Sequence, residues 1–257
     1  MLLLLPPSET KRDGGDAARR LVLPELGFAA LLRPRRTAIA ALRSLARNRG
    51  AMSAALGLGP QLAFEVERNR TLGSSPTLPA LERYTGVLYD ALDVATLPAA
   101  ALSMAAETVV IHSALFGLLP AGDHIPAYRL SHDSKLPDVR LRGLWAPPIA
   151  RELDAIEGLV IDMRSEGYVN LGPLAPAPNR VFLRVVTETS GGTRRALTHF
   201  NKKAKGAFVR AVLTSGIRHP DLASLMEWSA HAGIRLEQDT PGEVQLIVDE
   251  SRATVRA

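Results

Sequence analysis

The sequence predicts a single mixed α/β domain, in which a mixed, partly antiparallel sheet is flanked by helices and followed by a helix-hairpin-helix-like element. Three observations favour this class. Short apolar runs typical of buried strands recur along the chain, and segments with helical periodicity separate them. The turn sequence Ser190-Gly191-Gly192 is typical of an antiparallel hairpin. We expect one domain over residues 1–250 and a flexible tail over residues 251–257.

The expected elements follow one another in chain order. Apolar runs predict strands at Leu2–Leu5, Thr108–Ser113, Leu159–Met163 and Val244–Val248. Helical spacing of apolar residues predicts helices over Thr37–Arg49, Leu81–Leu92, Ala99–Glu107 and Leu144–Ile156, the last with Pro147-Pro148 in its first turn. The predicted hairpin consists of Arg180–Glu188 and Thr193–Phe200, and residues 117–126 are expected to form a turn-rich loop.

Composition and charge narrow the class of protein. The chain has 257 residues, of which 46% are hydrophobic and 22% charged, so it can bury a substantial core. Its net charge is +5 and its pI is about 9.9, and such a basic balance is part of the footprint of nucleic-acid binding. Residues 1–50 hold ten Lys or Arg against four Asp or Glu. A second basic region lies near residue 200, and a fold can bring the two onto one surface.

Several classes of site have no support. The chain has no Cys, which excludes disulfides, thiolate metal sites and Cys nucleophiles. Its six His residues are scattered without the spacing of a metal site, so we expect no metal and no cofactor. The apolar start is too short for a signal peptide and no segment has the length of a membrane span. We therefore expect a cytoplasmic, monomeric protein without a membrane partner.

The most informative segment begins at Asn201. Between Thr198 and Pro220 the chain has five Lys or Arg and no Asp or Glu. On a helix, Lys202, Lys203, Lys205 and Arg210 spread over the side opposite the apolar residues. A second helix opening at Pro220 gives a helix-hairpin-helix-like element over about residues 200–229, a device that contacts phosphates. The alternatives are a solvated charged face and an ordinary helix C-cap at Gly216.

Polar residues follow three of the predicted strands, where ligands bind in open α/β sheets. The first group contains Glu9 and Lys11, an acid and a cation that are candidates for catalysis. The alternative is a surface loop in which Ser and Thr cap a turn. The second group contains Tyr128, which is expected to stack on a base, and Arg129, which is expected to bind a phosphate. Alternatively, Tyr128 packs in the core and Arg129 pairs with a nearby carboxylate.

The third group contains Asp162, at the end of a predicted buried strand. It is a candidate general base, or it caps a turn or pairs with Arg164. The chain has no Gly-x-Gly-x-x-Gly after a strand, no Gly-x-Ser-x-Gly elbow and no phosphate-binding Gly-Lys-Ser/Thr loop. Hydrolase and nucleotide-driven activities therefore lose their usual support.

Taken in order, these segments resemble the YaaA family of peroxide-stress proteins. The segments that carry the resemblance are Leu2–Lys11, Tyr84–Tyr89, Ser113–Leu118, Pro126–Leu130, Leu144-Trp145, Ile161–Tyr168 and Phe200–Arg210. The resemblance implies an intracellular mixed α/β protein with a positively charged cleft, a DNA-binding helix-hairpin-helix-like element and a link to peroxide sensitivity and free iron. The chain departs from better-known members in its first loop, at Asp162, where they have Asn, and at Gly167, where they have Glu.

Two functions follow. In the first, the protein binds double-stranded DNA at the nucleoid in oxidative stress, with phosphates contacted by Lys202, Lys203, Lys205, Arg210 and Arg129. In the second, it is a DNA glycosylase that flips a modified base between the aromatic residues Tyr128, Trp145 and Tyr168. Glu9 or Asp162 then activates water or stabilises the sugar cation, with Lys11 as an alternative nucleophile. Acids in a cationic cleft favour some chemistry, whereas iron sequestration has no clustered ligands to support it.

Overall fold

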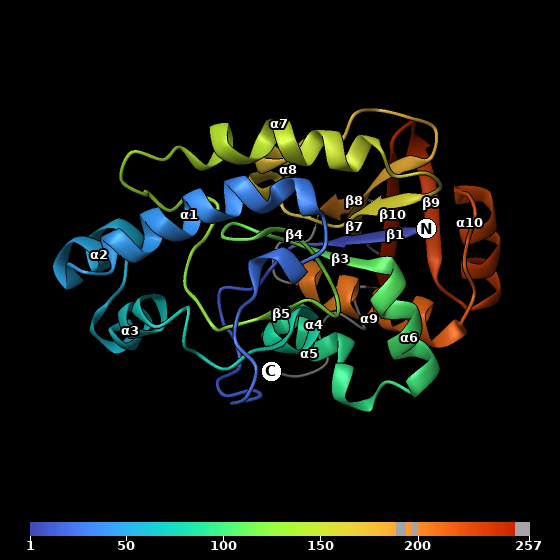
Figure 1. The fold of residues 1–257 in the computed structure, drawn as a ribbon. Helices are drawn as coiled ribbons and strands as arrows, with labels where there is room; N and C mark the ends of the chain where they lie inside the picture. The colour runs from blue at the N-terminus through green and yellow to red at the C-terminus, as the bar shows by residue number, and fades with distance from the viewer. Residues whose placement is uncertain (189–193, 197–199, 250–257) are drawn as a thin grey trace.

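The computed structural model describes residues 1–188, 194–196 and 200–249. Within this part, a mixed sheet of eight strands runs through the middle of the molecule, with helices on both faces (Figure 1). The strands are β1 (Leu2–Leu5), β3 (Val109–Ser113), β4 (Gly117–Pro120), β6 (Val160–Asp162), β7 (Arg180–Glu188), β8 (Arg194–Ala196), β9 (Arg235–Thr240) and β10 (Glu243–Asp249). A second, two-stranded sheet pairs β2 (Leu78–Pro79) with β5 (His124–Ile125). The predicted mixed α/β class is confirmed.

The strand order explains the apolar runs in the sequence. The main sheet has the order β4-β3-β1-β6-β7-β10-β9, and β8 pairs with β7 beside this path. Strands β3, β1, β6, β7 and β10 are mutually parallel, while β4, β8 and β9 pair antiparallel with their neighbours. Every residue of β1, β3 and β6 is buried, because helices cover both faces of the parallel centre.

A crevice is expected where the direction of strand order changes. From β1 the chain crosses to β3 on one side, and later places β6 on the other side of β1. The loops that follow β1 and β6 therefore leave the same edge of the sheet in opposite directions. These loops are Pro6–Lys11 and Met163–Ser165. This edge is where the sequence predicts ligand-binding residues.

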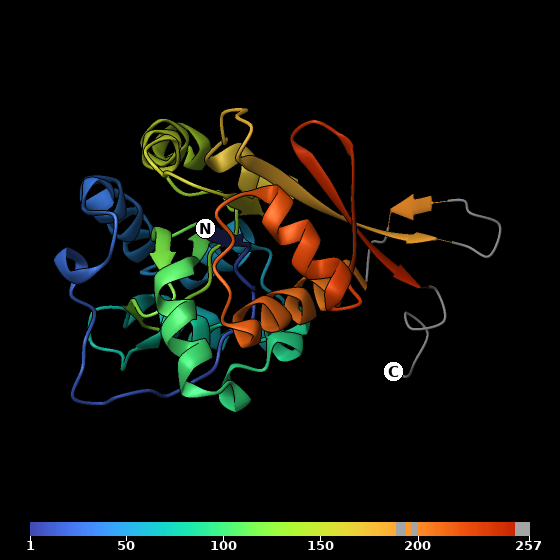
Figure 2. The ribbon, with the colours of Figure 1, turned by 90° about the vertical axis from the view of Figure 1, so that its right-hand side faces the viewer.

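The helices form two groups around the sheet. They are α1 (Leu32–Leu45), α2 (Arg49–Leu56), α3 (Phe64–Arg70), α4 (Ala80–Arg83), α5 (Val87–Leu92), α6 (Ala99–Thr108), α7 (Leu141–Asp154), α8 (Glu166–Leu171), α9 (Phe200–Ser215) and α10 (Leu222–His231). Helices α1 and α7 lie on one side of the sheet, and α5, α6 and α9 on the other (Figure 1). Figure 2 shows α1 and α2 at one side of the molecule and α9 away from them, beyond α6. The two basic regions therefore do not merge into one surface.

Some predicted elements differ from those observed. Residues 117–126, predicted as a loop, contain the short strands β4 and β5, which lie between turn residues and so resemble a loop in sequence. Helix α7 begins at Leu141, because Leu141 and Trp145 both pack into the core; Pro147 and Pro148 therefore lie inside the helix rather than in its first turn. The predicted helix over Leu81–Leu92 is divided at Gly86, whose φ of 97° no helix accommodates.

The predicted hairpin is confirmed in its pairing, since β8 runs antiparallel to β7 with Val186 opposite Ala196. Its turn, Ser190-Gly191-Gly192, lies outside the described residues, as does the tail predicted over residues 251–257. The succession of two helices predicted near residues 200–229 is present as α9 and α10. Gly216 follows α9 with a φ of 69°, the left-handed conformation of a helix C-terminus.

Candidate functional site

A cavity of about 700 Å³ opens at the carboxyl ends of β1 and β6. We call it the loop pocket. Its walls are residues 6–10 of the first loop, residues 131–132, residues 163–168 after β6, residues 182–185 of β7 and the first turns of α9. The pocket lies beside the first and third loops, where the sequence predicts ligand contacts. Residues 131–132 and β7 were not predicted to contribute, because their approach depends on the long-range fold.

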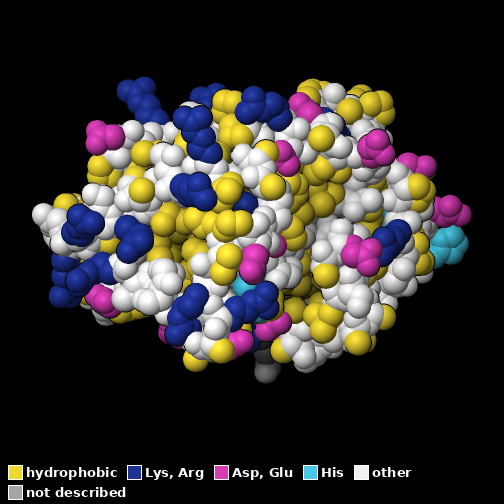
Figure 3. All heavy atoms as spheres, viewed as in Figure 1, with side chains coloured by type: hydrophobic (Ala, Val, Ile, Leu, Met, Phe, Trp, Pro, Cys, Tyr) yellow, Lys and Arg dark blue, Asp and Glu magenta, His cyan; other side chains and the backbone are white. Residues whose placement is uncertain are grey.

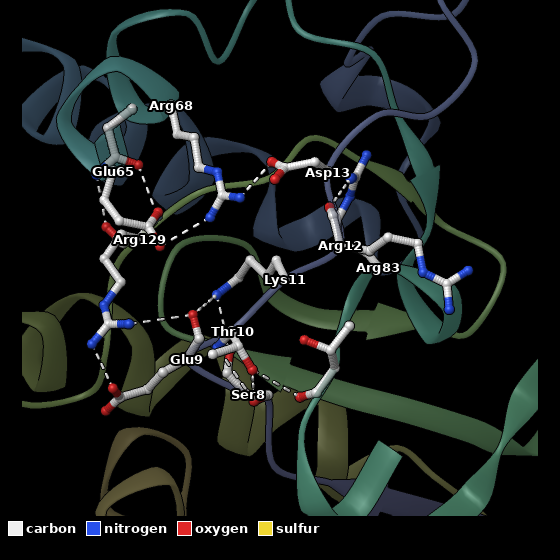
Figure 4. A network of polar contacts seen from close by, with 12 residues as sticks. Ser8, Glu9, Thr10, Lys11, Arg12, Asp13, Glu65, Arg68, Arg83 and Arg129 are labelled. Atoms are coloured by element: carbon white, nitrogen blue, oxygen red, sulfur yellow. Dashed lines mark hydrogen bonds and ion pairs between the residues drawn. The ribbon is translucent and has the colours of Figure 1, made fainter. Parts of the chain in front are cut away.

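Glu9 and Arg129 form an ion pair at the rim of the pocket. The Oε2 atom of Glu9 lies 2.5 Å from Nη2 of Arg129 (Figure 4). The Glu9 side chain is 64% exposed, whereas that of Arg129 is 15% exposed. Arg129 is therefore engaged with a carboxylate, the structural alternative that the sequence left open. Arg129 holds Glu9 in place. In turn, the Glu9 carboxylate neutralises most of the charge that Arg129 could offer to a phosphate.

Lys11 lies behind the first loop, under the backbone that forms the pocket wall. Its ammonium group donates to the carbonyl oxygens of Ser8 and Glu9, at 2.9 and 3.2 Å (Figure 4). It also lies 4.2 Å from the ring centroid of Tyr128. The side chain is 6% exposed and does not line the pocket. Lys11 thus organises the loop that carries Glu9. It does not contact the pocket itself, and it can affect a ligand only by fixing the position of that loop.

The surroundings of Lys11 disfavour its charge. Burial lowers the pKa of Lys11 to about 7, and the nearby Glu65 carboxylate opposes this shift while Arg129 and Arg68 add to it. The buried Oε2 atom of Glu65 has no hydrogen-bond partner among the described residues. A lysine with a pKa near neutrality is the form needed for a nucleophilic amine or a general base.

Asp162 pairs with Arg164 rather than facing the pocket. Two hydrogen bonds join the side chains, from Nε to Oδ1 at 2.9 Å and from Nη2 to Oδ2 at 2.6 Å, and the Arg164 backbone N–H also donates to Oδ1, at 3.0 Å. Both side chains are buried, and Arg164 but not Asp162 lines the pocket. Nη1 of Arg164 lies 2.9 Å from Nδ1 of His112, whose pKa burial lowers well below the usual range. The ion pair with Arg164, one of the predicted alternatives for Asp162, is therefore what the structure shows.

His132 and Gly167 contact each other at the pocket wall. A Cβ added at Gly167 would lie 2.4 to 2.6 Å from atoms of the His132 ring. The same ring meets Tyr168 edge to face at 5.1 Å between centroids. Only glycine leaves room for the imidazole at this place. The sequence did not predict this contact, because the long-range fold brings His132 and Gly167 together.

Of the three aromatic residues predicted to stack on a base, one lines the pocket. Tyr168 is 7% exposed and forms part of the wall. Tyr128 is fully buried, with its hydroxyl 2.6 Å from Ser113 Oγ and 2.8 Å from the Tyr84 hydroxyl. Trp145 is also fully buried and donates to the Ala114 carbonyl at 2.8 Å. The prediction is wrong for these two, because the core uses their ring area.

The four cations of α9 divide into two pairs. Lys202 and Lys203 are exposed, and Lys202 lines the pocket. Lys205 is 5% exposed and donates to the Met163 carbonyl at 3.0 Å, and burial lowers its pKa to about 8. Arg210 donates to the carbonyls of Leu92 and Asp93, each at 2.8 Å. The predicted single cationic face is therefore wrong for Lys205 and Arg210, which satisfy backbone carbonyls instead.

The N-terminus of α10, the helix that follows α9, is capped by a side chain of the protein. The Asp221 side chain accepts a hydrogen bond of 2.8 Å from the Ser224 N–H at the start of α10. The N-terminus of α10 thus already has a carboxylate where a phosphate was predicted to bind. Within the predicted element, the exposed cations that remain to contact a backbone phosphate are therefore those in the first turns of α9.

Other kinds of site have no support in the described part of the chain. No three His, Asp or Glu residues there are grouped in a way that could hold a metal ion. Among the same residues, no helix combines the length and apolar character of a membrane span.

Comparisons with known proteins show the family to which the chain belongs. The family model described as peroxide stress protein YaaA matches residues 1–238. A UPF0246 protein of Corynebacterium glutamicum is 40% identical over 244 residues, covering 93% of this chain and 96% of its own. A UPF0246 protein of Streptomyces coelicolor is 37% identical over 248 residues, covering 95% and 94%. The chain, with its crevice between β1 and β6, belongs to the YaaA family of peroxide stress proteins.

Proposed function

We propose that the protein binds double-stranded DNA as a monomer in peroxide stress, and that the loop pocket accepts a nucleotide from the bound duplex. The observation that carries this proposal is the position of Lys202. It lies at the mouth of a cavity of about 700 Å³, beside the exposed Lys203. A cavity of this volume is in the range of small-molecule sites. Binding of this kind implies a location at the nucleoid in the cytoplasm.

The distribution of charge supports contact with phosphates at one end of α9. Within the described residues neither Lys202 nor Lys203 forms an ion pair, so both are free to replace counterions on a phosphate backbone. The other cations of the pocket wall are engaged: Arg164 with Asp162, and Arg184 with Glu243 at 2.8 Å. We therefore assign the duplex contact to Lys202 and Lys203, with Lys205 and Arg210 supporting the helix that presents them.

The test is the salt dependence of duplex affinity. We expect Lys202→Ala to reduce the slope of log affinity against log salt by about 0.9, and Lys202→Ala/Lys203→Ala by about twice that. Arg151→Ala, an exposed cation on α7 at the other face of the sheet, is the matched control and should leave the slope unchanged. An unchanged slope in the double variant would show that these lysines are only solvated.

A second candidate function is base excision, and a specific observation favours it. Binding alone does not require an acid, yet Glu9 and Glu166 both line the pocket. In this scheme the Glu9 carboxylate, fixed by Arg129, accepts a proton from a water that attacks C1′ of the extruded nucleotide. The N-glycosidic bond breaks with its electron pair on the base nitrogen, which takes up a proton, and a C1′ hydroxyl remains.

The test of excision uses duplexes that carry oxidised, deaminated or hydroxymethylated bases. We expect free base and abasic sites with the native protein and strongly reduced release with Glu9→Gln. Intact duplex binding without base release from any of these substrates would reject excision and leave the binding proposal standing.

A further inference from the structure

The first long helix carries a row of exposed arginines, none of which lines the loop pocket. From Leu26 to Phe64 the chain has six Arg and no Asp or Glu. Helix α1 buries Ala38, Ile39, Leu42 and Leu45 on one side. On the other side Arg33, Arg36 and Arg43 are exposed, and Arg47, in the turn that follows the helix, is exposed as well. At 100° per residue the three helical arginines lie within about 80° of one another, and at 1.5 Å per residue they span about 15 Å.

In the described part of the chain, these guanidinium groups have no partner of their own. Within the described residues, no hydrogen bond or ion pair engages the side chains of Arg33, Arg36, Arg43, Arg47 or Arg49. By contrast, Arg35 on the same helix is fully buried and donates to the carbonyls of Gly27 and Leu118, at 2.7 and 2.8 Å. Figure 3 shows Lys and Arg side chains gathered over the part of the molecule where α1 and α2 lie. The exposed row is therefore a concentrated positive surface.

The row ends at a small groove with an exposed aromatic ring. A cavity of about 310 Å³ lies between the junction of α1 with α2 and helix α3. Arg47, Arg49 and Arg70 line it together with Phe64, which is 50% exposed. Glu67 also lines it and pairs with Arg70 at 3.1 Å. Arg47 and Arg49 thus supply the unneutralised charge beside the ring.

The ring of Phe64 is backed on one side and open on the other. The guanidinium carbon of Arg68 lies 4.6 Å from the ring centroid. Arg68 is itself held by Glu65, at 2.9 Å, and by Asp13. The phenyl group is therefore a fixed platform, of the kind on which nucleobases stack beside cations that follow the backbone.

From this juxtaposition we infer a second binding surface, for single-stranded nucleic acid, in which one base stacks on Phe64 and the phosphates follow the arginine row of α1. The groove is of a size for one base, and a base within a duplex has no free face to offer the ring. An anionic membrane fits less well, since an interfacial helix buries large apolar side chains and the residue within this row is Ala40. The surface is separate from the duplex contact proposed at α9.

The experiment measures binding of labelled oligo-dT, oligo-rU and a duplex of equal length across a salt series. We expect Arg36→Ala/Arg43→Ala to reduce the slope of log affinity against log salt by about 1.4 for the single strands. We expect Phe64→Leu, which keeps the apolar surface but removes the ring, to weaken single-strand binding about 5- to 150-fold, and Phe64→Tyr to restore it. Because these side chains are exposed, an unchanged unfolding midpoint verifies the fold of each variant.

Lys202→Ala separates this surface from the one at α9 and should leave single-strand binding unchanged. Preference for oligo-dT or for oligo-rU assigns the natural source of the ligand as DNA or RNA, and either supports the inference. The inference would be overturned, in favour of a general polyanion surface, if Arg36→Ala/Arg43→Ala reduced the salt slope of single-strand binding while Phe64→Leu left the affinity unchanged. Native affinity and slope in Arg36→Ala/Arg43→Ala would also overturn it.

Discussion

Helices α1 and α9 each carry four basic residues, yet they use them differently. On α1 three of the four are exposed, and only Arg35 turns inward. On α9 two of the four turn inward, because this helix packs against α5, α6 and β7. Each inward cation donates to backbone carbonyl oxygens: Arg35 to those of Gly27 and Leu118, Lys205 to the one after β6, and Arg210 to those at the end of α5. A cation becomes structural where the fold leaves carbonyls without partners, so counts of charge overstate the surface available to a polyanion.

The largest expected effect comes from two neighbouring residues of α1. Arg35→Ala should lower the free energy of unfolding by about 3 to 5 kcal/mol, because it leaves a cavity and several buried carbonyls without a donor. Arg36→Ala, one residue further, should change it by less than about 0.5 kcal/mol. Urea unfolding of both variants checks the difference. Equal effects would show that inward and outward arginines are not distinct classes.

The same contrast on α9 should be smaller. Arg210→Ala removes two donors to the carboxyl end of α5 and a third hydrogen bond, of 2.9 Å, to Thr96. Its half-buried position lets water replace part of these contacts, so we expect a loss of about 2 kcal/mol. The matched control Lys203→Ala should be close to neutral. Chemical unfolding measures both, and a loss in Lys203→Ala as large as in Arg210→Ala would contradict the division of α9.

The most modest expected effect is a pH dependence at Lys205. Its pKa in the folded protein is about 8, below the ordinary value of 10.5. Between these pH values the unfolded chain retains a proton that the folded chain has released, so stability rises with pH. We expect this residue to contribute a gain of about 2 kcal/mol between pH 7.5 and 10, on the order of 1.4 kcal/mol per pKa unit.

Replacing Lys205 by Met should remove that gain, whereas Lys203→Met should preserve it. Lys11 contributes a gain of the same sign in all three proteins, so the difference between the native protein and Lys205→Met isolates Lys205. The measurement is the free energy of unfolding as a function of pH. Parallel curves for the native protein and Lys205→Met would mean that Lys205 stays protonated in the folded state.

The sequence predicted those parts of the molecule that depend on local pattern. Strands β1, β3 and β6 were found because burial on both faces makes them apolar throughout, and the loops after them were predicted as ligand sites because they follow the carboxyl ends of strands. The partners across the fold were not predictable. Residue spacing gave no sign that His132 would lie against Gly167. The buried positions of Lys205 and Trp145 likewise depend on contacts between distant segments.

Helices α5 and α9 touch through their backbones. A Cβ at Gly206 would lie 2.1 Å from the carbonyl oxygen of Leu88, so no larger residue fits between them. With this clearance neither helix can slide or rotate past the other, and the lysine end of α9 is a rigid wall. In the function proposed above, selection of ligands by size would then fall to the other walls of the pocket, among them residues 6–10 of the first loop. Exchanging that loop between family members should transfer ligand preference while leaving the helical side untouched.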